Sequence, residues 1–477
     1  MESMFYKCSK LEEINISSFD TSNVINFTGM FYECRYLTSI DISSFRTPKA
    51  KTMDFMFYDC HALQSIDISN LDTSSVTNFG HIFRNCNSLT SINLKNFNTA
   101  NAKNMEYMFS SCTKLTDIDI SNFDVTKVTN FRYMFFNCKS LTFINLINFH
   151  TKNAINMEYI FGSCIKLTYI DVSNFDTSSA TNFGNIFRAC VSLTSLNVRN
   201  FNTSNAINME NMFGECLKLI YIDVSNFDTS NVINFGFMFF NFFSLIYINT
   251  GNFITKKATN MEYMFTDCFK LTDIDVSNFD TSSVTNFGYM FNDYRSLTSI
   301  NLANFNTSNA INMEHMFGEC TKLIYINVSN FDTSKVTNFG HMFYNCQSLT
   351  SINMKNFNTK NAENMESMFN HCHNLIDINV SNFDTSKVTT FKFIFSFCNS
   401  LTSINLSNFN IKKSADITFL FSDCYRLSYI DISSFPDSLN YHYTFEDIGP
   451  SGTIKINKEI NNTISKLLSD WSIIVEN

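Results

Sequence analysis

The sequence predicts an α/β repeat solenoid, in which one supersecondary unit is stacked many times. A cysteine recurs every 26 residues from Cys8 to Cys424, and Phe242 and Tyr294 fill the only two gaps in this series. Apolar residues recur with the same period from Met1 to about Phe435. A strict short period is typical of a solenoid whose repeats contact only their neighbours. We therefore predict about 17 repeats in residues 1–435 and a C-terminal capping segment in residues 436–477.

Bulk composition excludes several classes of protein. Hydrophobic residues make up 44% of the chain, which is too many for a disordered protein. No apolar run reaches the roughly 18 residues that a membrane span needs. The net charge of −9 and the lack of a lysine or arginine block argue against nucleic acid, because clustered cations dominate that affinity. Pro and Gly are scarce, so Asn, Asp, Ser and Thr are expected to make the turns.

A short helix is predicted before each cysteine. Positions in a repeat are numbered from its cysteine, and positions −7, −4, −3 and 0 are apolar, as in Phe27, Met30, Phe31 and Cys34. This i, i+3, i+4, i+7 spacing predicts one buried helical face. Position −8 is most often Asn, such as Asn26, and Asn favours a helix N-cap.

A short strand is predicted after each cysteine. Leu occupies position +3 in every repeat, Ile or Leu recurs at +6, and +8 is mainly aliphatic, as in Leu37, Ile40 and Ile42. Positions +6 and +8 lie on one face of a strand and +7 on the other. A Phe at +11 then anchors a turn that contains Thr. Each repeat is thus predicted to hold one parallel strand and one short helix.

A second period of 52 residues is superimposed on the first. Position −7 alternates between Phe and Met, as in Phe27 and Met53. Asp recurs every 52 residues from Asp20 to Asp384, and the repeats between them carry an acid at −6, such as Glu106. Like charges stacked ~4.8 Å apart would repel by about 0.9 kcal/mol even in water. The alternation is predicted to relieve this repulsion.

The repeat unit resembles that of the BspA-like leucine-rich-repeat surface proteins. The residues that carry the resemblance are Leu, Ile, Phe, Cys and an F-D-T-S turn at fixed offsets, as in Leu115–Cys138 and Leu323–Cys346. The resemblance implies a right-handed leucine-rich-repeat-like solenoid and a cell-surface or secreted protein that acts in adhesion. Phe45 and its equivalents stand where ordinary leucine-rich repeats place an Asn ladder, so that geometry is not assumed. The residues after Gly449 resemble a closing hairpin.

The sequence contains no catalytic motif that we recognise, and we expect no enzyme, no cofactor and no metal site. The cysteine column is interpreted as buried structural thiols, because Phe242 and Tyr294 show that the site accepts bulky apolar groups. A redox array or a soft-metal track is the alternative. The acidic columns are interpreted as solvated faces. The His371-Cys372-His373 triplet is the closest approach to a ligand cluster and is interpreted as a coincidence.

The leading hypothesis is a non-enzymatic binding module for protein or glycan ligands, which include host proteins by the resemblance. Its ligand-binding residues are unknown from the sequence, and both the outward strand positions and the variable residues around each cysteine are candidates. The variable residues include Arg35-Tyr36, His61-Ala62, Lys139-Ser140 and Gln347-Ser348. The alternative is a structural scaffold whose open first repeat associates end to end with another chain.

The first residues leave the compartment open. Met1–Phe5 is identical to Met365–Phe369, and no signal peptide precedes it. The chain is therefore interpreted as a fragment or an internal start of a longer protein, and an intracellular location stays open beside the cell-surface one.

Overall fold

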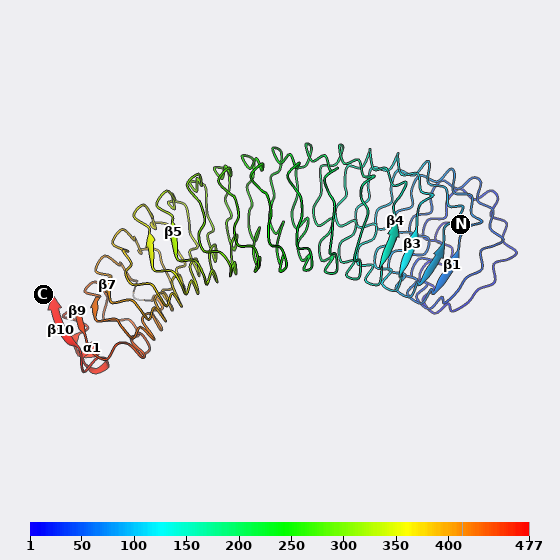
Figure 1. Ribbon diagram of the computed structural model, residues 1–477. Coiled ribbons are helices and arrows are strands. Elements are labelled where there is room, and N and C mark those ends of the chain that lie inside the picture. The colour runs from blue at the N-terminus through cyan, green and yellow to red at the C-terminus, as the bar shows by residue number, and fades with distance from the viewer. Residues whose placement is uncertain (413, 477) are drawn as a thin grey trace. The chain divides into compact units, whose positions relative to one another are not determined.

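The computed structural model describes residues 1–412 and 414–476. They form a β-solenoid with a period of about 26 residues and about 15 turns (Figure 1). The chain divides into two compact units. Unit 1 comprises Met1–Val232 and Asn241–Ile248, and unit 2 comprises Ile233–Phe240 and Asn249–Asn477. No helix in the described residues is long and apolar enough to cross a membrane.

Short parallel strands follow eight of the fifteen cysteines, so the predicted strand is formed in some of the described repeats and not in all. Unit 1 holds the pairs β1 (Ser65–Asp67) with β2 (Ser91–Asn93) and β3 (Asp117–Asp119) with β4 (Phe143–Asn145). In unit 2, β5 (Tyr325–Asn327) pairs with β6 (Ser351–Asn353). A four-stranded sheet of order β10-β9-β8-β7 is made of β7 (Ser403–Asn405), β8 (Tyr429–Asp431), β9 (Thr453–Asn457) and β10 (Ser472–Glu476). Paired residues such as Ile66 and Ile92 lie one period apart, so the predicted register is confirmed.

The short helix predicted in every repeat is wrong. Within the described residues the one helix is α1 (Asn461–Leu467), in the C-terminal segment. Positions −5 and −1 have positive φ, as at Phe55 (58°) and Asp59 (62°). Residues in this left-handed region interrupt a right-handed helix. The segment is instead a run of β-turns, in which Met56 N–H donates to Met53 O at 3.2 Å and Cys60 N–H to Phe57 O at 3.3 Å.

Other N–H groups of this segment donate to the next repeat. In the repeat of Cys60, Phe55 N–H donates to Gly80 O at 3.0 Å and Asp59 N–H to Arg84 O at 2.8 Å. The N–H groups at −7 and −3 do the same. A left-handed residue costs about 1–2 kcal/mol, and each added hydrogen bond returns about 0.5–1.5 kcal/mol. The apolar positions are buried as predicted, because the chain of β-turns also turns −7, −4, −3 and 0 inward.

Asn at −8 does not cap a helix. Asn78 Oδ1 accepts the N–H of Gly80 at 3.0 Å, and Asn104 Nδ2 donates to Asn78 Oδ1 at 3.0 Å. A Cβ added at Gly80 would lie 2.9 Å from Asn104 Nδ2. In the next repeat Asn130 Nδ2 donates to Glu106 Oε2 at 3.0 Å. Gly at −6 leaves room for the Asn amide of the next repeat, and the predicted role of the alternation in relieving charge repulsion stays a prediction.

An Asn ladder connects the repeats at position +10. The Phe at +11, because of which we did not assume such a ladder from the sequence, lies one position later. Asn70 Nδ2 donates to Ile42 O at 2.9 Å, to Ser43 O at 3.3 Å and to Phe45 O at 3.2 Å in the preceding repeat. Equivalent bonds recur at Asn122, Asn200, Asn330 and Asn382. The ladder satisfies carbonyl groups where each chain leaves its strand.

Buried Thr residues at +13 form a second ladder. Thr21 Oγ1 donates to Arg46 O at 2.8 Å and accepts the N–H of Arg46 at 2.7 Å. Thr47 Oγ1 donates to Asp72 O at 2.9 Å. Because both Thr side chains are buried, the Thr of the F-D-T-S turn is structural.

The Asp residues at +12 and the Asp or Asn residues at +7 each close a turn. Asp20 Oδ1 accepts the N–H of Ser22 at 2.9 Å, and Asp41 Oδ1 accepts that of Ser43 at 2.9 Å. The hydroxyl and backbone N–H of Ser22 lower the pKa of Asp20, and the backbone N–H of Ser43 lowers that of Asp41. These carboxylates are therefore ionised turn-forming groups.

Identical residues stack in columns in the core. The rings of Phe31 and Phe57 are stacked with centroids 5.4 Å apart. All fifteen cysteines are free, and fourteen are buried, with Cys8 exposed. Cys60 Sγ donates to Phe31 O at 3.2 Å, and burial raises the pKa of the Cys138 thiol to about 12. These contacts support the interpretation as structural thiols. Met4, at position −4 of the first repeat, is exposed, whereas the methionines at −4 in the later repeats are buried.

The C-terminal segment continues the parallel sheet and is not a hairpin. β9 pairs with β8, and α1 returns the chain so that β10 lies parallel to β9. The indole N–H of Trp471 donates to Gly449 O at 3.0 Å. The predicted hairpin is wrong because a helical crossover joins the two strands. The division into residues 1–435 and 436–477 stays a prediction.

Ala189→Gly is expected to stabilise the protein by up to about 1 kcal/mol, because Ala189 has a φ of 55° and Gly adopts that angle without steric cost. Ala100, outside the left-handed region, gives the matched control, and Ala100→Gly is expected to cost about 0.5–1 kcal/mol. Denaturant midpoints measure both. An equal loss in the two variants would contradict strain at position −1.

Tyr294→Phe is expected to leave stability unchanged or raise it by about 1 kcal/mol. Tyr294 replaces a column cysteine, is fully buried, and its hydroxyl has no hydrogen-bond partner among the described residues. Tyr441→Phe is the control and should destabilise, because the buried Tyr441 hydroxyl donates to Pro436 O at 2.8 Å. Thermal unfolding of both variants tests this expectation. A clear loss of stability in Tyr294→Phe would show that the Tyr294 hydroxyl has a hydrogen-bond partner.

Acid is expected to weaken the turns at +12. A lowered folded-state pKa stabilises the fold above the unfolded value near pH ~4, and this contribution is lost as the pH falls through the folded value. The pKa values of Asp280, Asp332 and Asp384 are lowered by bonds from the following Ser. Replacing all three by Asn keeps the acceptor, as Asn202 shows with Ser204 N–H at 3.1 Å. The triple variant should lose less stability than the parent between pH ~5 and ~2 in circular dichroism melts; identical pH profiles would refute this.

Candidate ligand-binding face

The outward side chains of the strands form the surface with the most chemical variety. In β1 and β3 the central Ile is buried, and the residues at +5 and +7 on either side of it are exposed. We call the +5, +7 and +9 side chains of unit 1 the strand face. The Asx turns fix position +7 as Asp or Asn, whereas +5 varies freely between Ser, Asp, Glu and aromatic residues.

The first part of the strand face is acidic. Its carboxylates are Glu13, Asp41, Asp67, Asp117 and Asp119. Lys95 at +9 is exposed beside them. Backbone and side-chain bonds from Ser121 lower the pKa of Asp119, and the Ser69 side chain lowers that of Asp67. Both are anions at neutral pH.

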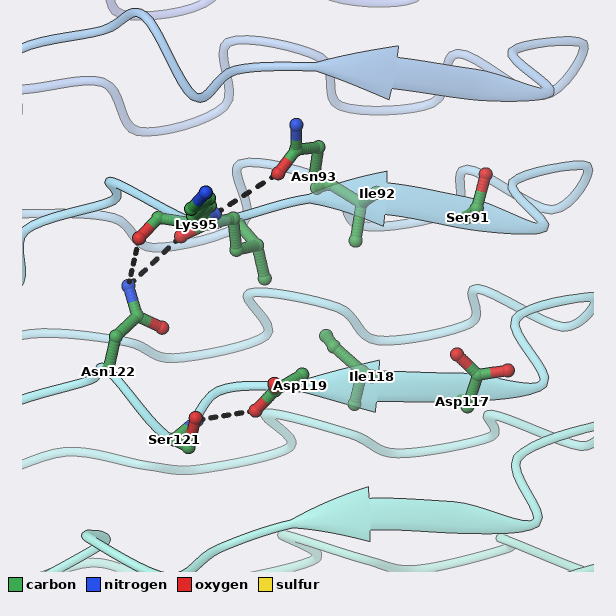
Figure 2. Close-up of a pocket in the computed structure, with 10 residues that line it drawn as sticks. Ser91, Ile92, Asn93, Lys95, Asp117, Ile118, Asp119, Ser121 and Asn122 are labelled. Atoms are coloured by element: carbon green, nitrogen blue, oxygen red, sulfur yellow. Dashed lines mark hydrogen bonds between the residues drawn. The ribbon is translucent and has the colours of Figure 1, made fainter.

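A hollow lies between β2 and β3 in this acidic part. Figure 2 shows Asn93 and Lys95 on one side of it and Asp117 and Asp119 on the other. Asp119 Oδ1 accepts the N–H of Ser121 at 3.0 Å, which fixes the carboxylate at the end of the strand. Thr116 Oγ1 donates to Asp117 Oδ2 at 3.1 Å. The two carboxylates outnumber the one lysine of the lining, so the hollow favours a cation.

The second part of the strand face is aromatic. Phe143, Tyr169, Tyr221 and Tyr247 occupy +5 and are 56%, 58%, 50% and 56% exposed. Tyr221 and Tyr247 are bridge partners in neighbouring repeats. A second hollow is lined by Phe143, Ile147 and Tyr169, with Asp171 at its edge. The rings form two pairs in neighbouring repeats of unit 1, with Ser195 at +5 of the repeat between the pairs.

One ion pair lies within the aromatic part. Arg199 Nε donates to Asp223 Oδ2 at 2.7 Å. Bonds from Ser225 and from Arg199 lower the pKa of Asp223 to about 2. Both charges are therefore held together beside Tyr221.

The aromatic residues at +5 were missed by sequence reasoning, although one signal could have found them. A bulky ring at an outward strand position contradicts the alternation of buried and exposed residues. Ser65, Ser91 and Ser195 fill the same position in other repeats of unit 1. The fold therefore does not need a ring there.

Some of the variable residues around the cysteines, by contrast, form ion pairs. Arg35 Nη2 lies 3.0 Å from Glu33 Oε2 and 3.1 Å from Asp59 Oδ2. His61 Nε2 lies 3.3 Å from Asp59 Oδ1. Tyr36, next to Arg35, is 61% exposed. Arg35 thus joins its own repeat to the next one.

The His371-Cys372-His373 triplet is split by the core. The buried Cys372 Sγ donates to Phe343 O at 3.2 Å, whereas the His371 ring stacks on Phe397 with centroids 4.2 Å apart. His373 Nδ1 lies 3.0 Å from Phe397 O. No group of three metal-ligating side chains occurs among the described residues.

A column of half-buried rings at −5 is the other aromatic feature of unit 1. Phe55, His81, Tyr107, Tyr133 and Tyr159 stack with centroids 4.3 to 4.7 Å apart. Burial lowers the pKa of His81 to about 4, so this ring is neutral at physiological pH. The stacked rings connect consecutive repeats, so we interpret them as structural.

One carboxyl pair in unit 2 has an unusual protonation state. Burial and the neighbouring Asp293 raise the pKa of Asp267 to about 7. Arg295 Nε lies 2.6 Å from Asp293 Oδ1. The two acids occupy −1 in consecutive repeats, and burial beside Asp293 favours the protonated form of Asp267.

Comparison with solved structures finds leucine-rich-repeat proteins. The chain is similar to a leucine-rich repeat protein from Bacteroides ovatus, with 17% identity and a TM-score of 0.30 over 98% of this chain and 88% of that one. It is similar to TLR13 in its complex with ssRNA13, with 13% identity and a TM-score of 0.25 over 94% and 75% of the chains. The Drosophila Toll–Spatzle complex matches with 14% identity and a TM-score of 0.22 over 95% and 53%. No curated protein sequence matches the chain significantly.

A family model matches almost the entire chain. It is described as "Mycoplasma protein of unknown function, DUF285" and matches residues 1–89, 62–169, 155–271, 240–352 and 340–447. These overlapping matches cover the whole predicted repeat region. The chain therefore belongs to the DUF285 family of repeat proteins.

Proposed function

We propose that this protein is a non-enzymatic binding module whose strand face in unit 1 binds a macromolecular ligand. The observation that carries the proposal is the row of exposed rings at Phe143, Tyr169, Tyr221 and Tyr247. A monomeric protein rarely exposes a contiguous apolar surface without a binding role. Tyr and Arg dominate the energetics of protein interfaces, and both occur here.

Neighbouring apolar side chains enlarge this surface. Ile147, Ile220 and Ile246 are 63%, 53% and 55% exposed beside the rings. The backbone of each strand is paired with the adjacent repeats, as in β3 with β4. A ligand therefore contacts side chains on the face of the strands and adds no strand to an edge.

We place this binding activity at the cell surface, in adhesion. The support is the resemblance of the repeats to the BspA-like surface proteins, which also supports a right-handed solenoid. Nearly every fixed polar position in the described residues belongs to a structural ladder, which supports a binding role for the strand face, where position +5 varies. The alternative, a self-assembling scaffold, would instead show association that rises with protein concentration.

Replacing the strand-face rings is expected to abolish ligand binding without unfolding the protein. The triple variant Tyr169→Ser, Tyr221→Ser and Tyr247→Ser uses the residue found at Ser195 in the same column. Binding to an immobilised extracellular-matrix preparation and to a glycan array should fall about thirtyfold or more, because losing even one aromatic anchor of an interface costs about 2 kcal/mol.

Equally exposed residues outside the strand face provide the control. Ile25, Ile155 and Ile207 at −9 are 58%, 50% and 48% exposed, and Thr occupies this position in alternate repeats. Changing all three to Thr removes exposed apolar area outside the strand face and should leave binding unchanged. Equal losses in the two triple variants, or none in either, would refute the assignment. Light scattering of the parent tests the scaffold alternative.

A further inference from the structure

We propose that the strand face of unit 1 binds an extended basic polypeptide, with cationic side chains over its acidic part and apolar side chains over its aromatic part. This inference rests on the proposed function and names the ligand class of the same surface. It rests on two observations. Acidic side chains give way to rings from one strand to the next along unit 1, and one hollow lies in each of these two parts.

The charge of the strand face selects a cationic ligand. Seven carboxylates occupy its +5 and +7 positions: Glu13, Asp41, Asp67, Asp117, Asp119, Asp171 and Asp223. Two cations, Lys95 and Arg199, occupy +9, and Arg199 is paired with Asp223. The surplus of negative charge attracts a basic partner and repels nucleic acid and acidic glycans.

Asx turns hold the carboxylates at +7 in a fixed position. Each Asx turn uses one oxygen, as Asp67 Oδ1 accepts Ser69 N–H at 2.9 Å and Asp171 Oδ1 accepts Ser173 N–H at 2.9 Å. The turn fixes the carboxylate group, so little side-chain entropy is lost when a lysine or arginine binds it. The pKa of Asp171 is lowered by its bonds to Ser173, which keeps the group ionised.

The two hollows lie in successive repeats. The acidic hollow includes Asp117 and Asp119 of β3, and the aromatic hollow begins at Phe143 of β4. β3 and β4 are hydrogen-bonded neighbours. Strands stack about 4.8 Å apart, so the centres of the two hollows are separated by roughly 10 Å. An extended peptide advances about 3.3 Å per residue, so a cation and an apolar residue two to four positions apart reach both hollows.

The aromatic part suits such a peptide in two ways. Phe143 and Tyr169 offer apolar contact in the hollow, and the exposed ring faces also attract lysine and arginine by cation–π interaction. Neutral sugars also stack on rings, but they gain nothing from the neighbouring acids. The acidic hollow beside the rings therefore favours the polypeptide.

A set of synthetic peptides of about 12 residues tests the proposal. The first has alternating Lys and Ser in one half and alternating Leu and Ser in the other, and the second has the halves in the reverse order. A third replaces Lys by Glu. Fluorescence anisotropy should show binding of one or both Lys peptides and none of the Glu peptide, and the affinity should fall as salt rises from about 50 to about 300 mM.

Matched variants separate specific docking from attraction to an acidic protein. Asp117→Ser with Asp119→Asn uses residues that other repeats carry at +5 and +7, and should weaken the Lys peptides about fivefold or more. Asp124→Asn with Asp176→Asn removes the same charge from the turns at +12 and should change affinity less than about twofold. Equal effects of the two double variants would overturn the proposal.

A neutral oligosaccharide, chitohexaose, distinguishes failure of this inference from failure of the proposed function. Chitohexaose binding that needs Tyr169 and Tyr221 but neither Asp117 nor Asp119 would overturn the polypeptide ligand and leave the binding module intact. Loss of Lys-peptide binding in the triple Tyr variant, with no chitohexaose binding by the parent, would support the inference.

Discussion

The backbone N–H groups at alternate positions before each cysteine donate to the next repeat, and these bonds shape most of the molecule. Asp59 N–H to Arg84 O at 2.8 Å is one of them. In a helix most of these N–H groups would donate within the repeat, and this side of the stack would lose its backbone bonds to the next repeat. Strained residues at −5 and −1 are tolerated because the bonds between repeats are made only in that conformation. The stack is therefore stabilised through contacts that no isolated repeat can form.

The same constraint explains which residues recur. Backbone carbonyl groups that the strands and turns leave unpaired need donors from the adjacent repeat, and Asn70 and Thr47 supply them. Asp41 and Asp20 close the turns that reverse the chain. Nearly every fixed polar column thus has a structural task. A repeat sequence this regular records hydrogen bonding between neighbours more than it records function.

Much of this could be predicted from the sequence, and the failures have a common cause. The period, the parallel register and the buried columns follow from spacing, as Ile66 opposite Ile92 shows. The helix did not follow, because Phe27, Met30, Phe31 and Cys34 are buried alike by a helix and by a chain of β-turns. Hydrogen bonds between repeats distinguish the two, and spacing within one repeat does not reveal them. The exposed rings were missed for a related reason, since position +5 has no fixed residue to draw attention.

Position +5 is informative because the fold gives its side chain no structural role. Ser195 between Tyr169 and Tyr221 shows that a small polar residue satisfies the strand. A ring with half its area in water gains little from packing and costs solubility, so the fold alone gives no reason for four of them in unit 1. The acids in the neighbouring repeats are held ionised by Asx turns, which adds fixed negative charge beside the rings. The Asx turns account for Asp or Asn at +7, whereas packing does not account for the rings at +5, and the proposed ligand, both cationic and apolar, would contact the two together.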